Sequence, residues 1–147
     1  MTTLFIDIET YSEVNLTRAG AHRYAEHPST EVLLFGYAIG DGPAHVIDLT
    51  AEPDDSRIQV LNDASMTLIA HNSAFDRVVL QHALGIAAPL SRWRCSMAKA
   101  LSVSLPGALA MLSQVLGLTD DQAKIADGKR LVQKFCKPAP ANRKVRR

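Results

Sequence analysis

The chain has 147 residues, a length that suits one domain with its own hydrophobic core. Apolar residues make up 47% of the sequence and charged residues 21%, ordinary globular values that exclude a disordered or fibrous chain. The formal net charge of +1 hides a division, because half of the 16 basic residues lie in residues 129–147, which contain none of the 15 acids. This basic end could neutralise nucleic-acid phosphates or could simply be a solvated, solubilising tail.

Targeting signals and cysteine chemistry add little to this picture. The N-terminus has no basic start followed by a long apolar run, so we expect no signal peptide, no membrane span and a cytoplasmic location. Cys95 and Cys136 lie far apart and without paired spacing, which argues against both a zinc site and a disulfide framework.

The first predicted element is a strand over "LFIDIET", residues 4–10, which carries Asp7 and Glu9 within an apolar run. Because side chains alternate along a strand, the two carboxylates share one face, with their bases about 6 to 7 Å apart. Two charges this close repel each other unless a cation offsets them. The pattern therefore predicts either a site for a hard divalent metal or an edge strand whose acids face water.

The next segments predict a loop and then a hairpin. Residues 11–31 are polar and contain Gly20 and Pro28, so we expect a loop with a helical turn at residues 18–25. Residues 32–40 and 44–49 are rich in β-forming side chains and flank a "DGP" turn. The first three strands are thus predicted to form an antiparallel meander.

The second half of the chain predicts helices mixed with short strands. In order, these are a short helix at 56–64, a buried strand at 66–72, a helix from Ser73 to Leu84 ended by Gly85, and a strand within 92–97. Two more helices follow, the first opened by Pro106 and Gly107 and closed by Gly117, and the second between Asp120 and Phe135. The first of these two has Leu109, Leu112, Val115 and Leu116 on one face. Residues 138–147 contain two prolines and no apolar period, which predicts a flexible basic tail. The whole order indicates an α/β fold with a mixed sheet flanked by helices.

A second group of polar residues follows the strand at 66–72. Asn72 stands at the strand end and Asp76 about one turn into the next helix, where ligands of α/β sheets commonly bind. Asp76 could join Asp7 and Glu9 in an oxygen-rich cage suited to Mg2+ or Mn2+, or it could serve only the helix dipole. Asn72 could cap the helix or contact a phosphate, and His71 is expected to be a hydrogen-bonded core residue.

Several motifs in the same order resemble a known enzyme family. The quoted segments are "LFIDIETYSEV", "HRYAEHP", "VLLFGYAI" followed by "DGP", "AHNSAFDRVVL", "LPGAL" and "GKRLVQKFCKP". They resemble the DEDD-type, DnaQ-like 3′-5′ exonucleases, and in particular the N-terminal proofreading domain of bacteriophage and prophage family A DNA polymerases. The resemblance implies an RNase H-like five-stranded mixed sheet and a domain over residues 1–137.

The resemblance also implies a mechanism and a set of residues. Two divalent ions, Mg2+ or Mn2+, would bind the scissile phosphate during release of a nucleoside monophosphate from the 3′ end of single-stranded DNA. By motif position Asp7 would bridge both metals, Glu9 would hold the metal that carries the nucleophile, and Asp76 would hold the second metal. Thr10 and Asn72 would contact the terminal nucleotide.

One family feature has no counterpart in this sequence. The family carries a fourth carboxylate on a late helix, in a Tyr-x-x-x-Asp or His-x-x-x-x-Asp motif, whereas none of Asp120, Asp121 and Asp127 follows a Tyr or His at that spacing. We therefore expect a domain that is truncated before the third motif and lacks the last helix. Its metal site would be incomplete, and the sequence shows no polymerase domain.

Three functional interpretations follow. The first is an exonuclease fragment of a phage-type polymerase, which predicts metal-dependent removal of 3′ nucleotides. The second is a catalytically impaired nucleic-acid-binding module, whose salt-sensitive affinity for DNA would survive Asp7→Ala. The third is a prophage remnant that needs a separately encoded polymerase chain to supply the late helix.

Overall fold

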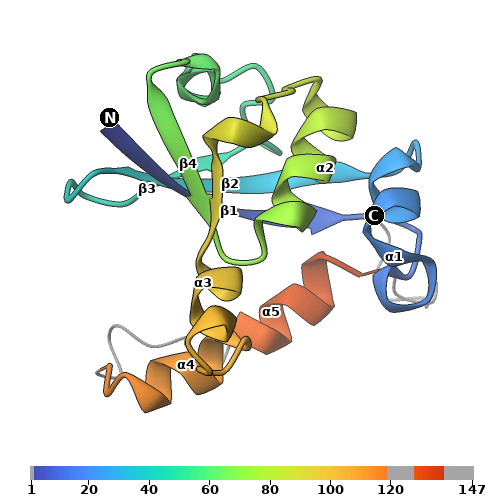
Figure 1. Ribbon diagram of the computed structural model, residues 1–147. Helices are drawn as coiled ribbons and strands as arrows, with labels where there is room; N and C mark the ends of the chain where they lie inside the picture. The colour runs from blue at the N-terminus through green and yellow to red at the C-terminus, as the bar shows by residue number, and fades with distance from the viewer. Residues whose placement is uncertain (1, 119–127, 138–147) are drawn as a thin grey trace.

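Strand β1 (Thr2–Tyr11) is the central strand of a five-stranded sheet with the order β3-β2-β1-β4-β5 (Figure 1). The fold is taken from a computed structural model, which describes residues 2–118 and 128–137. β1 pairs antiparallel with β2 (Glu31–Ile39), and β2 pairs antiparallel with β3 (His45–Asp48). The predicted hairpin and three-stranded meander are therefore confirmed.

The other side of β1 carries parallel strands. β4 (Met66–Ala70) pairs with the first half of β1, and the short β5 (Trp93–Cys95) pairs with β4. The sheet is thus mixed, as the sequence predicts. The helical elements between and after the strands are α1 (Leu16–Glu26), the 3-10 helix η1 (Ser56–Asn62), α2 (Ser73–Leu84), the 3-10 turn η2 (Leu90–Arg92), α3 (Ser96–Ser102), α4 (Leu109–Val115) and α5 (Gly128–Phe135).

Helix α1 is longer than the helical turn predicted at residues 18–25 within the loop over residues 11–31. The Asn15 side chain accepts a hydrogen bond of 3.1 Å from the Arg18 backbone N–H and starts the helix, as N-cap residues do. Gly20, with φ of 79°, interrupts the helical backbone, and the helix ends at Glu26, shortly before Pro28. The interruption at Gly20 breaks the apolar period, which is why the sequence pattern indicates only a single turn.

The helices after β5 also differ from the expectation. Helix α3 has no counterpart in the sequence prediction, and of the four apolar residues predicted for one face of α4 only Leu112 is buried. The predicted helix between Asp120 and Phe135 is described from Gly128 onward. Residues 119–127 and the predicted tail at 138–147 lie outside the described residues, as do Asp120, Asp121 and Asp127.

One face of the sheet forms the hydrophobic core with α1 and α2. The core residues from β1, β2, β4 and α2 include Leu4, Ile6, Ile8, Val32, Phe35, Leu68, Ala70, Val78, Val79 and Leu80. Leu4, Phe35, Leu68, Val79 and Leu80 are completely buried. In the described part of the chain, no helix is both long and apolar enough to cross a membrane.

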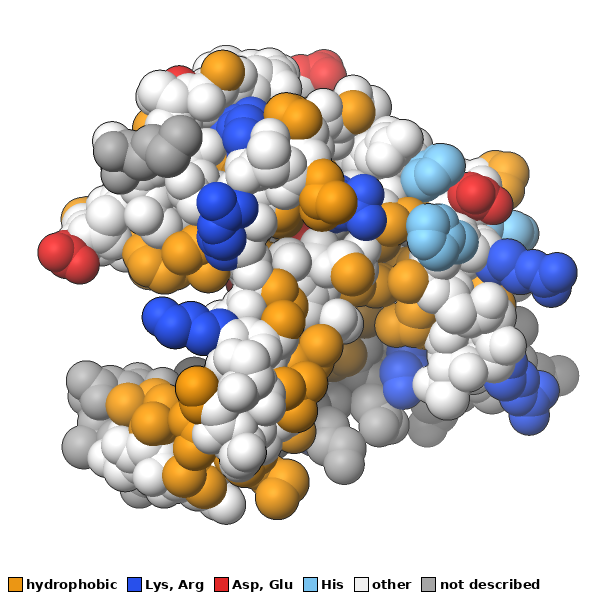
Figure 2. All heavy atoms as spheres, in the orientation of Figure 1, with side chains coloured by type: hydrophobic (Ala, Val, Ile, Leu, Met, Phe, Trp, Pro, Cys, Tyr) orange, Lys and Arg blue, Asp and Glu red, His pale blue; other side chains and the backbone are white. Residues whose placement is uncertain are grey.

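The segment from α3 to Leu118 is packed very differently. Its large apolar side chains are 43% to 62% exposed, and we call this set the α3–α4 apolar surface: Leu101, Val103, Leu109, Met111, Val115, Leu116 and Leu118. Figure 2 shows hydrophobic side chains gathered over the part of the molecule where α3 and α4 lie in Figure 1. An exposed apolar patch of this kind is uncommon on a monomeric protein.

Candidate functional site

The two acids of β1 lie on the face of the sheet opposite the hydrophobic core. Leu4, Ile6 and Ile8 are buried, whereas Asp7 is exposed and Glu9 is half-buried, as the alternation along a strand predicts. The β1–β2 register shifts between Glu9 and Thr10, where β2 carries an extra residue. Such bulges re-aim side chains and are frequent next to active sites.

The pairing of β1 with β4 explains how Asp76 approaches Asp7. β4 accompanies β1 only as far as Phe5, opposite Ile69, and then leaves the sheet through residues 71–72 into α2. The edge of β1 that contains Asp7 is therefore open on this side, and the first turn of α2 carries Asp76 to it. The crevice lies beyond the carboxyl ends of two parallel strands, the usual place for a ligand in an α/β sheet.

Asp76 is an unusual carboxyl group because only 4% of it is exposed. Burial, together with the negative charge of Asp7, raises the pKa of Asp76 from its ordinary value of 3.8 to about 7. The charge of Asp7 thus acts on Asp76 across the crevice between β1 and α2, although 69 positions separate 7 and 76 in the sequence. Buried acids with a raised pKa beside a second acid are typical of functional sites.

Glu9 contacts a different part of the chain. The thiol of Cys136, just after α5, donates a hydrogen bond of 3.6 Å to Glu9 Oε2. Within residues 2–118 and 128–137, no group of three or more His, Cys, Asp and Glu side chains is arranged to hold a metal ion. The structure therefore brings Asp7 and Asp76 together, and the three-carboxylate cage stays a prediction.

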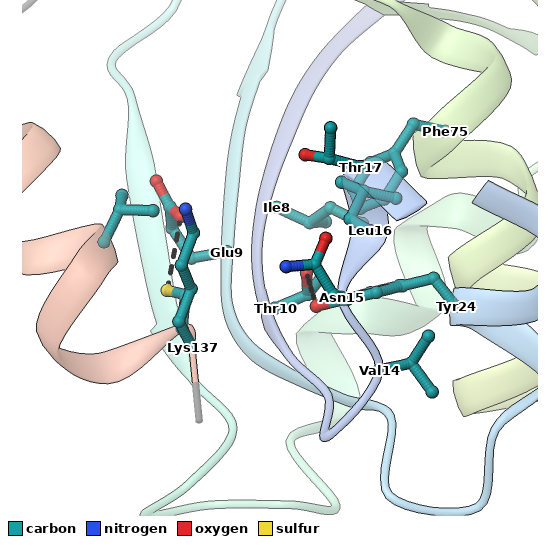
Figure 3. A pocket seen from close by; sticks show the side chains of 12 residues that line it. Ile8, Glu9, Thr10, Val14, Asn15, Leu16, Thr17, Tyr24, Phe75 and Lys137 are labelled. Atoms are coloured by element: carbon teal, nitrogen blue, oxygen red, sulfur yellow. Dashed lines mark hydrogen bonds between the residues drawn. The ribbon is translucent and has the colours of Figure 1, made fainter. Parts of the chain in front are cut away.

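A cavity of about 410 Å3 opens beside Glu9 and Thr10 (Figure 3). The hydroxyl groups of Thr10 and Tyr24 are 2.9 Å apart and hydrogen-bonded, and both residues are buried. The ring of Tyr24 in turn lies 5.8 Å from the ring of Phe75 in α2. The remaining wall comes from β1, from the start of α1 with the residue before its cap, and from the end of α5: Ile8, Val14, Asn15, Leu16, Thr17, Val132, Cys136 and Lys137.

Asn72 lies between β4 and α2, where the sequence predicts it. It occupies the N-cap position of α2 in the left-handed conformation, with φ of 72° and ψ of 46°, but its side chain makes no capping hydrogen bond. It is also absent from the lining of the cavity beside Glu9. His71, by contrast, is the hydrogen-bonded residue that was expected, because its ring contacts the Ser96 hydroxyl at 3.0 Å and the Gly107 carbonyl oxygen at 2.8 Å.

Several cavity residues are not identified by sequence reasoning. Tyr24 falls in the short helical turn predicted at residues 18–25, and Phe75 is an ordinary apolar position of a predicted helix, so neither pattern indicates a cavity. Cys136 and Lys137 are more than 120 residues away from Glu9 along the chain. The available signal is that the segments "HRYAEHP" and "GKRLVQKFCKP" lie within the stretch that resembles the exonuclease family, but neither segment indicates any chemistry by itself.

Comparison with curated proteins relates the chain to a polymerase. It is 37% identical over 148 residues to a DNA polymerase of Bacillus phage SP02, in a match that covers 97% of this chain. By sequence this chain is similar to one part of a phage DNA polymerase, and by fold it is similar to nucleases. The match spans 22% of the length of that polymerase. No family model matches the chain.

Solved structures of nucleases share the fold of this chain. A structure described as the apo form of a nuclease has a TM-score of 0.60 and 21% identity, covering 85% of this chain and 55% of that one. NrnC of Brucella melitensis has a TM-score of 0.55 and 24% identity, covering 88% of this chain and 63% of NrnC. A second NrnC structure, bound to pGG, has a TM-score of 0.55 and 22% identity, covering 89% of this chain and 63% of that one. These similarities show that the fold is the RNase H-like fold of these nucleases.

Proposed function

We propose that this chain is a DnaQ-like domain, the 3′-5′ exonuclease part of a phage-type DNA polymerase, and hydrolyses the terminal phosphodiester bond of single-stranded DNA. The observation that carries the proposal is the approach of Asp76 to Asp7 in the crevice between β1 and α2. Two carboxylates that lie near each other raise the free energy of each other's charged form, and a bound cation would offset this cost.

The chemistry of these residues fits a divalent cation. Asp7, Glu9 and Asp76 offer only carboxylate oxygens, the ligands that Mg2+ and Mn2+ prefer. Asp7 and Asp76 would hold the cation between β1 and α2, and Glu9 would join them after releasing the Cys136 thiol. When bound, the cation supplies positive charge that activates water and stabilises the leaving 3′ oxygen.

The protein's own groups would bind and orient the substrate. The cavity beside Glu9 has the size of a small-ligand site, and its wall combines the aromatic rings of Tyr24 and Phe75 with the polar groups of Thr10 and Asn15. The Thr10–Tyr24 hydrogen bond fixes both side chains at the wall. A terminal nucleotide held here would place its phosphate near Glu9, while Asn72 would contact the strand at the start of α2.

The polymerase match supports a partner for this activity. Because the relative is a DNA polymerase and the match covers only 22% of its length, we propose that the domain works beside a polymerase region. That region could follow in the same polypeptide or be a separately encoded chain. It would supply the fourth carboxylate that the family uses and that no Tyr-x-x-x-Asp motif provides here.

The test is digestion of a 5′-labelled single-stranded oligonucleotide with Mg2+ or Mn2+ by the purified chain. We expect a ladder that shortens from the 3′ end, which disappears in Asp7→Ala and on chelation of the metal. Asp41→Ala is the matched control, because Asp41 is an exposed acid in the turn between β2 and β3. Equal products from the parent and Asp7→Ala would refute nuclease activity of this chain, and DNA binding without cleavage would favour the binding-module alternative.

A further inference from the structure

The end of α5 places a basic side chain at the mouth of the candidate site. Lys137 lines the cavity together with Glu9, Thr10 and Asn15, and Figure 3 shows its side chain extending alongside Glu9. Lys137 is exposed, and no hydrogen bond or ion pair of its ammonium group is present among the residues that the structure describes. A cation in this position is available to an anionic ligand that enters the cavity.

The attachment of α5 explains why Lys137 is held there. Leu131, Val132 and Phe135 share a second apolar cavity with Leu33 and Leu34, on the carboxylate face of β1 and β2. Cys136, one residue before Lys137, donates its hydrogen bond to Glu9. The Cys136 hydrogen bond holds the end of α5 beside Glu9, and Lys137 therefore lies at the opening of the cavity.

The charge of α5 is opposite to that of the strand beside it. Residues 128–137 include Arg130, Lys134 and Lys137 and no acid, whereas the neighbouring face of β1 carries Asp7 and Glu9. A nucleic acid brings phosphates toward these two acids and is repelled by them. A basic side chain at the same opening offsets that repulsion and attracts the phosphate backbone.

We propose that Lys137 binds a backbone phosphate of the single strand whose 3′ end enters the cavity beside Glu9. This inference rests on the proposed function, because it assumes that the cavity receives a nucleic-acid end. Lys137 is a substrate-binding residue in this proposal and takes no part in proton transfer. Its ammonium group provides a point charge that is not selective for the base.

The test is binding without hydrolysis. A fluorescein-labelled oligothymidylate is titrated with the full chain in EDTA at several salt concentrations, and its affinity is followed by fluorescence anisotropy. For single strands, the slope of log K against log salt falls by about 0.7 for each phosphate contact that is lost. We expect Lys137→Ala to bind several-fold more weakly at low salt with a slope reduced by about that amount, and Lys137→Arg to keep the parent's slope.

Lys99→Ala is the matched control. Lys99 is an exposed lysine on α3, at the far edge of the sheet, and it lines neither the cavity beside Glu9 nor the one under α5. We expect its slope to equal that of the parent. An unchanged slope in Lys137→Ala, an equal loss in Lys99→Ala, or no binding by the parent would each overturn the proposal.

This measurement separates the two proposals. Hydrolysis needs the divalent metal, and EDTA removes it, so the slopes do not depend on whether the domain cuts DNA. A reduced slope in Lys137→Ala together with no digestion in Mg2+ would support the phosphate contact and refute the nuclease. Digestion by the parent with an unchanged slope in Lys137→Ala would support the nuclease and refute the phosphate contact of Lys137.

Discussion

The sheet with α1 and α2 and the segment from α3 to Leu118 bury their apolar side chains to very different degrees. Leu4, Phe35 and Leu68 in the sheet are fully buried, whereas Val103, Met111 and other members of the α3–α4 apolar surface are more than half exposed. Both segments contain apolar residues at regular spacing. Apolar spacing therefore predicts that an element forms, and its tertiary neighbours decide whether the face is buried.

The candidate site lies in the well-packed region, with α5 as its only late contribution among the described residues. Asp7, Glu9 and Asp76 stand on elements that carry the hydrophobic core, so their positions do not depend on α3 or α4. Exposed apolar residues contribute little to stability until something covers them. Four substitutions test this division between the two regions, beginning with the one of largest expected effect.

Leu68→Ala should lower the free energy of unfolding by about 2–5 kcal/mol, because Leu68 is completely buried on β4 and the change leaves a cavity in the core. Urea denaturation followed by far-UV circular dichroism measures the effect. A loss below about 1 kcal/mol would mean that the core around β4 relaxes freely and that the packing contrast is smaller than the structure indicates.

Asp76→Asn should stabilise the domain at about pH 8 in the absence of metal. The folded domain keeps a proton on Asp76 up to a pKa of about 7, whereas the unfolded chain releases it near the ordinary value of 3.8. Stability of the parent therefore falls as the pH rises from about 4 to about 7, by about 1.4 kcal/mol for each unit of pKa difference. Thermal melts across this pH range measure the trend.

The same melts provide the control for Asp76. The variant should lack this fall between about pH 4 and 7, and added Mn2+ should raise the melting temperature of the parent near pH 8 but not that of the variant. Parallel pH curves for the two proteins would show that Asp76 is not the group that titrates abnormally.

Tyr24→Phe should cost about 1 kcal/mol of unfolding free energy, because it removes the buried hydrogen bond of 2.9 Å to the Thr10 hydroxyl. The ring, which contacts Phe75, is retained. A double-mutant cycle with Thr10→Val isolates the pair. Additive losses in the cycle would mean that the two hydroxyl groups do not interact in solution.

Leu116→Ala should change the free energy of unfolding by no more than about 0.5 kcal/mol, because Leu116 is 55% exposed on the α3–α4 apolar surface. It is the same chemical change as Leu68→Ala, so the ratio of the two effects measures the contrast directly. Chemical denaturation of both variants under identical conditions provides it. A cost comparable to that of Leu68→Ala would show that the surface is covered in solution, for example by a second copy of the chain.

Much of the fold could be predicted because it depends on local patterns. The hairpin of β2 and β3, the strand β4, and the helix α2 ended by Gly85 in the left-handed conformation all follow from alternation, turn residues and capping. Helix α1 is predicted only as a turn at residues 18–25 because Gly20 interrupts it, and α3 is not predicted because its seven residues are too few to show a period.

The sequence by itself determined that Asp7 and Glu9 share the face of β1 opposite the core, because alternation along a strand is a local property. Only the tertiary structure decided that β4 leaves β1 before Asp7 and lets Asp76 approach, and that Cys136 and Lys137 return to Glu9 from the end of the chain. These contacts join residues far apart in sequence, and no local spacing records them. They depend on how strand pairing and the burial of apolar faces bring separate elements together.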